Sequence, residues 1–242
     1  MRHVDVVTLF PQLFGPFLGE GLLKRAQDSQ AVVIATVDLR EYGLGKHRTV
    51  DDVPYGGGPG MVLRPEPVFA AVRAREAWHR ERGRGIRRIL LTPQGRPFDQ
   101  AMARELAGRD ETQLFICGRY EGFDERIRTG LADEEISGGD FVCLGGEVIA
   151  MAVIEAMVRL LPGVLGNPRS IDQESFTGER LEYPQYTRPA EFEGQTVPAV
   201  LLSGHHGEIE RWRREQALAR TRERRPELIG KCRETRNRTG EP

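Results

Sequence analysis

Three glycine-bearing turns in one stretch of the chain, Gly118–Gly146, have the residue types of a ligand site. A continuous apolar run, Gln113–Cys117, ends at the first turn, as expected of a parallel strand that is covered on both faces. The later turns, Gly138–Gly139 and Gly145–Gly146, enclose the apolar run Phe141–Leu144, which we expect to form a further strand. Because ligands of open α/β sheets bind where strands end, the three turns predict one crevice.

Carboxylates in the same stretch restrict the ligand. A phosphate held by backbone N–H groups would be repelled by so many acids, so a neutral or cationic ligand fits better. The alternative is that the glycines only form tight turns and that the acids cap helices. The acids are Glu121, Asp124, Glu125, Asp140 and Glu147.

Length and composition predict one large unit with a smaller appendage and no membrane span. The chain has 242 residues, of which 39% are hydrophobic and 29% charged. Its most apolar helical stretch, 150–161, is too short and too interrupted by Glu155 and Arg159 to cross a bilayer. We expect no leader segment, because Met1 runs directly into a strand pattern. Three cysteines without CxxC spacing argue against a disulfide scaffold or a zinc site. We therefore expect a soluble, cytoplasmic protein with no metal cluster.

Positive charge is concentrated near the C-terminus. Residues 211–238 contain eleven Lys or Arg and four Glu, a charge of +7. Because the net charge of the whole chain is −1, the remaining residues together carry a charge of −8. A basic helical tail on an acidic body is typical of a surface that binds nucleic acid, and a solvated basic face is the alternative.

Hydrophobic periodicity predicts alternating strands and helices, and hence a parallel α/β sheet. We expect strands at 2–10, 32–39, 86–91 and 113–117, and helices at 11–28, 66–82, 99–106, 147–158 and 208–220. Residues 92–95 are predicted to form a turn at a strand end. The glycine-rich residues 46–61 lack the ending of a P-loop and predict a shaped functional loop. Trp212, in the last helix, is expected in a core or a stacking contact.

Several stretches together resemble the bacterial tRNA (guanine-N1)-methyltransferases of the SPOUT superfamily. They follow one another along nearly the whole chain, so the set is far more specific than any one motif. The stretches are Thr8–Pro11, His47–Asp52, Pro54–Met61, Pro93–Gly95, Cys117–Gly122, Gly145–Glu147, Pro162–Gly166, Tyr186–Pro189 and Leu201–Gly204.

The resemblance implies a knotted parallel-sheet methyltransferase domain at 1–161, an interdomain linker at 162–187 and a small C-terminal helical domain at 188–242 that binds tRNA. It also implies a homodimer, S-adenosylmethionine as methyl donor and the guanosine at tRNA position 37 as acceptor. The cofactor residues carried over by position are Pro93, Gln94, Gly95, Gly118, Tyr120, Glu121, Gly138, Gly139, Asp140, Phe141, Val142, Cys143, Gly145 and Gly146.

The resemblance further implies two catalytic residues. The family's linker base corresponds to Glu174, where the family has Asp, and its cation at the end of the helix after the knot corresponds to Arg159. By chemistry, the base removes the N1 proton and the cation stabilises charge on guanine O6. Asp172 is the rival base, and an Arg at a helix C-terminus can simply complement the helix dipole. A Mg²⁺ requirement is suggested by the resemblance alone, because no cluster of candidate ligands supports it.

Three other functions compete with this interpretation. A knotted methyltransferase with another target, such as a ribose 2′-hydroxyl or another base, would need neither the 46–61 loop nor the linker acid. A non-catalytic RNA-binding protein that keeps the fold is favoured by the replacement of the family's Asp by Glu174. A nucleotide-dependent oxidoreductase is disfavoured because no GxGxxG turn follows the first strand.

Overall fold

The computed structural model describes residues 1–167, 170–171, 173–178 and 180–229. The chain divides into two compact units, 1–166 and 167–242.

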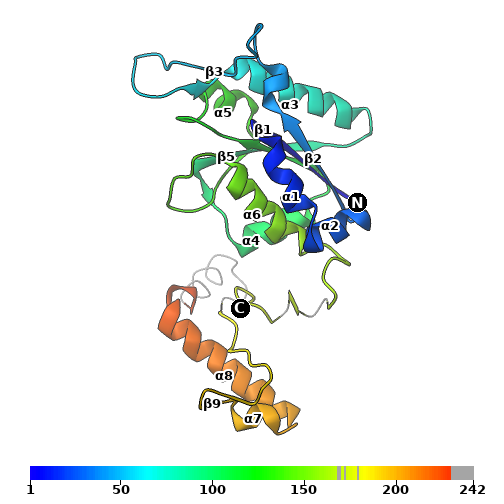
Figure 1. Ribbon diagram of the computed structural model, residues 1–242, viewed down its shortest axis with the longest axis vertical. Helices are drawn as coiled ribbons and strands as arrows, with labels where there is room; N and C mark the ends of the chain where they lie inside the picture. The colour runs from blue at the N-terminus through cyan, green and yellow to red at the C-terminus, as the bar shows by residue number, and fades with distance from the viewer. Residues whose placement is uncertain (168–169, 172, 179, 230–242) are drawn as a thin grey trace, which may run out of the picture. The chain divides into compact units, whose positions relative to one another are not determined.

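A five-stranded parallel sheet organises the first unit (Figure 1), which confirms the predicted α/β class. The strand order is β2-β1-β6-β5-β7, so the last strand in the sequence lies at an edge. The pairing of β1 with β2 runs without interruption from Arg2 opposite Val32 to Thr8 opposite Asp38. The strands are β1 (Arg2–Thr8), β2 (Val32–Asp38), β5 (Ile86–Pro97), β6 (Thr112–Cys117) and β7 (Glu134–Ser137).

Helices cover both faces of this sheet, as Figure 1 shows. One core lies under α1 (Phe14–Leu18), α2 (Gly21–Asp28), α4 (Gln100–Gly108) and α6 (Glu147–Val158). The other lies under α3 (Pro65–Arg80), α5 (Glu125–Leu131) and the 3₁₀ helix η2 (Leu39–Tyr42).

The central strand β6 explains the continuous apolar run in the sequence. Phe115 and Cys117 belong to one core, Leu114 and Ile116 belong to the other, and all four are buried. Because successive side chains of a strand point to opposite faces, a strand covered on both sides needs apolar residues at every position.

The prediction of a single helix at 11–28 is wrong. The segment forms the 3₁₀ helix η1 (Pro11–Leu13), then α1 and α2, with a break between Leu18 and Gly21. Gly21 has φ +59°, a left-handed conformation that glycine adopts without a steric penalty. The apolar spacing continues across the break because α1 and α2 both pack on the same core.

The strand expected at Phe141–Leu144 is also wrong. These residues form an irregular loop in which Val142 is 84% exposed and Leu144 is 91% exposed. The strand that completes the sheet is β7, whose sequence begins with two acids. Glu134 is paired with Arg109 at 2.8 Å and Glu135 with Arg128 at 3.3 Å, so arginines neutralise the acids of this edge strand.

The turn expected at 92–95 is an excursion within one long strand. Leu91 and Arg96 both lie opposite Ile136 of β7, so β5 leaves the ladder after Leu91 and rejoins it at the same partner. Gly95 is required here, because a Cβ would lie 2.5 Å from the backbone carbon of Glu135.

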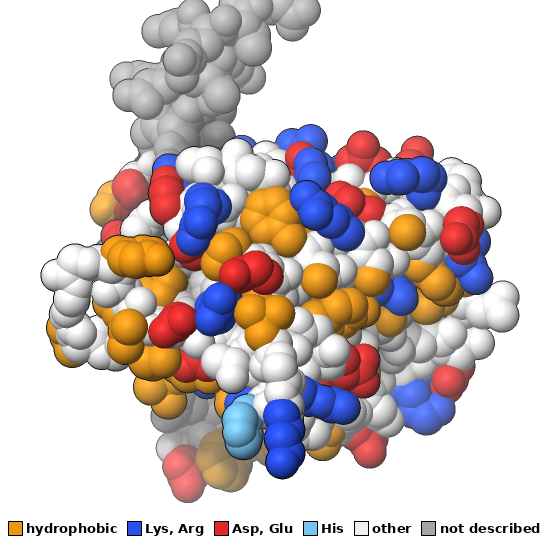
Figure 2. Space-filling view, turned by 90° about the horizontal axis from the view of Figure 1, so that it is seen from above, with side chains coloured by type: hydrophobic (Ala, Val, Ile, Leu, Met, Phe, Trp, Pro, Cys, Tyr) orange, Lys and Arg blue, Asp and Glu red, His pale blue; other side chains and the backbone are white. Residues whose placement is uncertain are grey.

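The 46–61 loop contains a short strand, β3 (Asp51–Asp52), which pairs antiparallel with β4 (Val62–Leu63) just after the loop, so that residues 53–61 form the turn between them. Figure 2 shows the surface of this end of the molecule, where hydrophobic side chains are exposed among acidic and basic ones.

The second unit contains a two-stranded hairpin, β8 (Glu191–Phe192) with β9 (Gln195–Thr196), followed by α7 (Ala199–Leu202) and α8 (His206–Arg224). Sequence reasoning missed the hairpin, and α8 is longer at both ends than the helix expected at 208–220. Within the part of the chain that the structure describes, no helix has both the length and the apolar character needed to cross a membrane.

Candidate functional site

A cavity of about 180 Å³ lies at the carboxyl ends of β6 and β7, beside the excursion of β5. The β5 excursion contributes Pro93, the turn after β6 contributes Gly118–Gly122, and the segment between β7 and α6 contributes Gly138 and Phe141–Gly146. Leu91, Ile136 and Ile149 supply apolar walls. The predicted convergence of the glycine turns on one crevice is therefore what the structure contains.

Close backbone approach explains the glycines of this cavity. The Gly146 N–H donates to the Gly118 carbonyl at 2.9 Å, and a Cβ on Gly146 would lie 3.0 Å from the Cα of Cys117. A Cβ on Gly138 would lie 2.4 Å from the Cδ1 of Ile149. A side chain at Gly146 would push the two turns apart, and one at Gly138 would displace Ile149 from the cavity wall. Both glycines therefore preserve a cavity whose apolar walls suit a ring system.

A buried polar network supports the turn after β6. Thr8 Oγ1 donates to Glu147 Oε1 at 2.8 Å, and Arg119 Nη2 lies 2.9 Å from Glu147 Oε2. The Glu147 side chain is fully buried, and the Arg119 guanidinium lies 4.4 Å from the ring centre of Phe10. The network ties the end of β1 and the start of α6 to the cavity.

The structure corrects the charge argument made from the sequence. Asp124 and Glu125 are ion-paired with Arg126 and Arg128, and these hydrogen bonds lower the pKa of both carboxyls. Glu147 is buried with Arg119. Of the five acids counted in the stretch, Glu121 alone is among the residues that line the cavity, beside Arg119. The acids of this stretch therefore do not by themselves exclude an anion.

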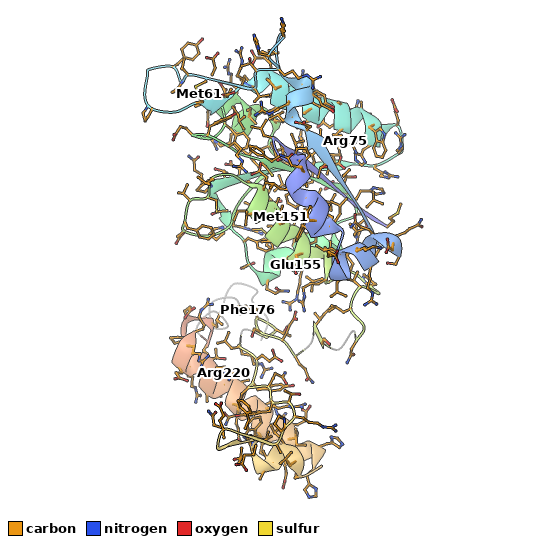
Figure 3. All side chains as sticks on the ribbon, in the orientation of Figure 1. Met61, Arg75, Met151, Glu155, Phe176 and Arg220 are labelled. Carbon is orange, nitrogen blue, oxygen red and sulfur yellow. The ribbon has the colours of Figure 1, made fainter. Side chains whose placement is uncertain are left out.

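The 46–61 loop is anchored beside the same cavity. The Glu121 N–H donates to the Met61 carbonyl at 2.9 Å, and the Leu63 N–H donates to the Gly122 carbonyl at 2.9 Å (Met61 is labelled in Figure 3). Gly60 has φ +80°, and a Cβ there would lie 2.4 Å from the carboxylate of Glu121. The tip of the loop is open to solvent, since Tyr55 is fully exposed.

Ten of the fourteen expected cofactor residues line the cavity. Gln94, Gly95, Gly139 and Asp140 are in the same loops but are not among its lining residues. Sequence reasoning missed Arg119, although it stands between two expected residues, and missed the apolar walls, which look like ordinary core positions.

The two expected catalytic residues belong to different units. Arg159 is half-buried at the C-cap of α6, where its backbone N–H donates to the Glu155 carbonyl at 3.2 Å. Glu174 is half-buried in the second unit and lines a cavity there with Arg213 and Arg214. The rival base, Asp172, lies outside the described residues. Among those that are described, no group of three His, Cys, Asp or Glu side chains is placed to hold a metal ion.

Known proteins resemble this chain along almost its full length. Residues 1–231 match the sequence profile of the family described as tRNA (Guanine-1)-methyltransferase TrmD. Three relatives, each called tRNA (guanine-N(1)-)-methyltransferase, come from Staphylococcus species. That of S. haemolyticus is 53% identical over 226 residues, 93% of this chain and 90% of the relative. Those of S. carnosus and S. aureus are 51% and 52% identical, each over 94% of this chain and 91% of the relative.

Proposed function

This chain belongs to the tRNA (guanine-1)-methyltransferase family, and on that premise we propose that it transfers a methyl group from S-adenosylmethionine to N1 of guanosine 37 in tRNA. The observation that carries the proposal is the single cavity in which ten of the fourteen expected cofactor residues meet.

The glycine turns would hold the cofactor. Leu91, Ile136 and Ile149 offer apolar contact to an adenine ring. Gly118, Gly138 and Gly146 keep the surrounding segments close together, because a Cβ at each would meet protein atoms. Glu121, the acid that lines the cavity, is a suitable neighbour for the cationic end of the ligand. When bound, S-adenosylmethionine supplies an electrophilic methyl group on a sulfonium.

Two residues of the chain would remove the proton from guanine N1 and stabilise the negative charge that develops on the base. Guanine N1 carries a proton, and we assign the Glu174 carboxylate as the base that accepts it. As the proton leaves, negative charge grows on guanine O6, and the Arg159 guanidinium would stabilise that charge. Glu174 is one methylene longer than the family's Asp, and its irregular segment can absorb the difference by a small backbone shift.

A homodimer and a trefoil knot are further parts of the proposal. Phe141, Val142 and Leu144 in the cavity loop, together with Val148 at the start of α6, are at least half exposed, an apolar surface that a second copy would bury. For the knot, the supporting contact is the bridge between Arg119 and Gly145, which brings the segment after β7 against the turn after β6.

The second unit would grip the tRNA. Arg211, Arg214, Arg222 and Arg224 are exposed on α8 and can contact phosphates. We place the reaction in the cytoplasm, where tRNA is processed. A Mg²⁺ requirement would be met by an ion that arrives with tRNA phosphates, since the described residues contain no cluster for it.

Methyl transfer to unmodified tRNA transcripts tests the proposal. Purified protein with S-adenosylmethionine should methylate a transcript with G37, and nucleoside analysis should show N1-methylguanosine. The matched transcript with A37 should stay unmodified. A product methylated on ribose or on another base would identify a different methyltransferase, and tRNA binding without any product would favour the non-catalytic alternative.

A further inference from the structure

A groove in the second unit has the chemistry of a nucleotide site. It has a volume of about 400 Å³ and is formed by the segment 183–190, by Val197, by α7 and by α8. We call it the α8 groove. The residues that matter here are Tyr183, Tyr186, Arg188, Leu201, Ile209 and Arg213.

The wall of the α8 groove is fixed against the helix at several points. The Leu181 N–H donates to Oγ1 of the buried Thr221 at 2.9 Å. Arg220, labelled in Figure 3, donates to the Glu182 carbonyl at 3.4 Å. The Arg213 guanidinium lies 4.8 Å from the ring centre of Tyr183. These contacts hold the segment that follows Leu181 along α8 before any ligand arrives, which lowers the entropy cost of binding.

Arg213 presents a donor that nothing in the described part of the chain satisfies. Its Nε is buried and has no hydrogen-bond partner there. Leaving a buried donor unpaired costs about 1–3 kcal/mol. Because this Nε has almost no accessible surface, a ligand that brings an acceptor oxygen reaches it after a small turn of the Arg213 side chain. Arg188 adds a second positive side chain, and the described lining residues of the groove include no acid.

Aromatic and apolar groups provide the other half of a nucleotide site. Tyr186 is 49% exposed, and its ring centre lies 6.4 Å from that of Trp212. Leu201 and Ile209 form an apolar floor. Proteins read single-stranded RNA by stacking unpaired bases on aromatic rings while Arg contacts the backbone.

We propose that the α8 groove binds one unstacked nucleotide of the RNA, with its base against Tyr186 and a phosphate oxygen accepting from Arg213 Nε. This inference rests on the proposed tRNA substrate. It adds a second contact point for the RNA, formed entirely within the second unit and separate from the exposed arginines of α8.

Replacement of the stacking ring is the first test. In the full-length protein, Tyr186→Ala should weaken binding of an unmodified G37 transcript about tenfold or more, as expected when one base–aromatic stack is removed. Tyr186→Phe keeps the ring and should bind like the wild type. Phe192→Ala removes a comparably exposed aromatic side chain of the same unit from outside the groove, and should have no effect. Arg213→Lys keeps the charge, removes the Nε donor and should weaken binding in the same direction.

Trp212 gives a direct optical signal. A Trp78→Phe background leaves it as the single tryptophan, and tRNA should quench its fluorescence in the Tyr186→Phe protein but not in the Tyr186→Ala protein. A series of transcripts with one abasic nucleotide each should contain a position whose effect is not additive with Tyr186→Ala.

Three results would overturn the proposal. Unchanged tRNA affinity in Tyr186→Ala is one, and additivity at every abasic position is another. The third is a changed sedimentation coefficient of Tyr186→Ala without RNA, because the groove would then be a contact between copies of the chain. Methyl transfer by the wild type is measured alongside. Its failure removes the proposed function and leaves this inference to the binding tests, whereas its success with an unaffected Tyr186→Ala removes this inference alone.

Discussion

Arg119 and Glu147 meet in an ion pair, 2.9 Å between Nη2 and Oε2, in which the carboxylate is fully buried and the guanidinium is 20% exposed. The pair connects the turn after β6 with the first residue of α6. These two walls of the cavity are far apart in sequence, and the pair helps to hold them together beside the hydrogen bond from Gly146 to Gly118.

Loss of the cation from this pair should be costly. Arg119→Met leaves the Glu147 carboxylate buried without a counter-ion, and we expect the free energy of unfolding to fall by about 3 kcal/mol in urea denaturation at pH 7. Glu147→Gln keeps the oxygen that accepts from Thr8 and leaves the more exposed Arg119 to water, so the destabilisation should be smaller. Equal stabilities of Arg119→Met and the wild type would show that the pair does not stabilise the fold.

A Cβ at Gly146 should damage the cavity. In Gly146→Ala the new Cβ would meet the Cα of Cys117 at 3.0 Å and the Gly118 nitrogen at 3.2 Å, and backbone atoms cannot turn aside as a side chain can. We expect calorimetry to show at least tenfold weaker binding of S-adenosylmethionine. Gly108→Ala, at the end of α4, meets nothing within 4 Å and serves as the control. Normal binding by Gly146→Ala would place the cofactor elsewhere.

The two cysteines in the described part of the chain should react very differently with iodoacetamide. Cys143 is exposed and lines the cavity, whereas burial, together with the Glu147 carboxylate, raises the pKa of the Cys117 thiol well above its usual value. In a Cys232→Ser background, mass spectrometry should find Cys143 labelled and Cys117 intact at pH 8. S-adenosylmethionine should slow the labelling of Cys143, and an unchanged rate at saturating cofactor would argue against its binding there.

Glu174 should be required for chemistry and dispensable for binding. Glu174→Gln is expected to reduce single-turnover methyl transfer by about 10²- to 10⁴-fold, the range for a lost general base. Glu174→Asp should remain active, since the ordinary pKa values of the two acids differ by only ~0.4. An inactive Asp172→Asn beside an active Glu174→Gln would reassign the base, and activity in both would remove the linker acids from that role.

Exposed arginines of α8 should determine the salt dependence of tRNA binding. Changing Arg214, Arg222 and Arg224 to Gln should weaken binding and flatten the slope of log K against log salt, by roughly one for each phosphate that is no longer neutralised. The same number of exposed arginines changed in the first unit, Arg25, Arg40 and Arg80, should leave the slope unchanged. If both triple variants behave alike, net charge and not position is responsible.

The sequence predicts a strand well where both of its faces are buried under apolar side chains. It predicts a strand poorly where ion pairs neutralise the charged residues of that strand. β6 is recognisable because both of its faces are covered, so all six of its residues are buried. β7 is not, since Glu134 and Glu135 look like solvated acids until their arginine partners are known. Phe141 and Val142 look like part of a strand because they are apolar, but both are exposed in an irregular loop.

The candidate site could be located by its glycines, but its charges could not be assigned. The residues next to Glu147 in the sequence do not indicate that its side chain is buried against Thr8 and Arg119, because these contacts join three distant parts of the chain. The α8 groove was equally hidden: Trp212 alone was expected to pack or stack, and the hairpin before α7 has only two residues in each strand.

The excursion in β5 has a consequence for the speed of ligand capture. Residues 92–95 depart from and return to the same partner, Ile136, so both ends of this short segment are fastened to one rung of the ladder. A segment fastened in this way has few alternative shapes to lose. This part of the cavity wall is therefore preformed before a ligand binds. The association rate of the ligand should be limited by diffusion through the opening and not by a rearrangement of residues 92–95.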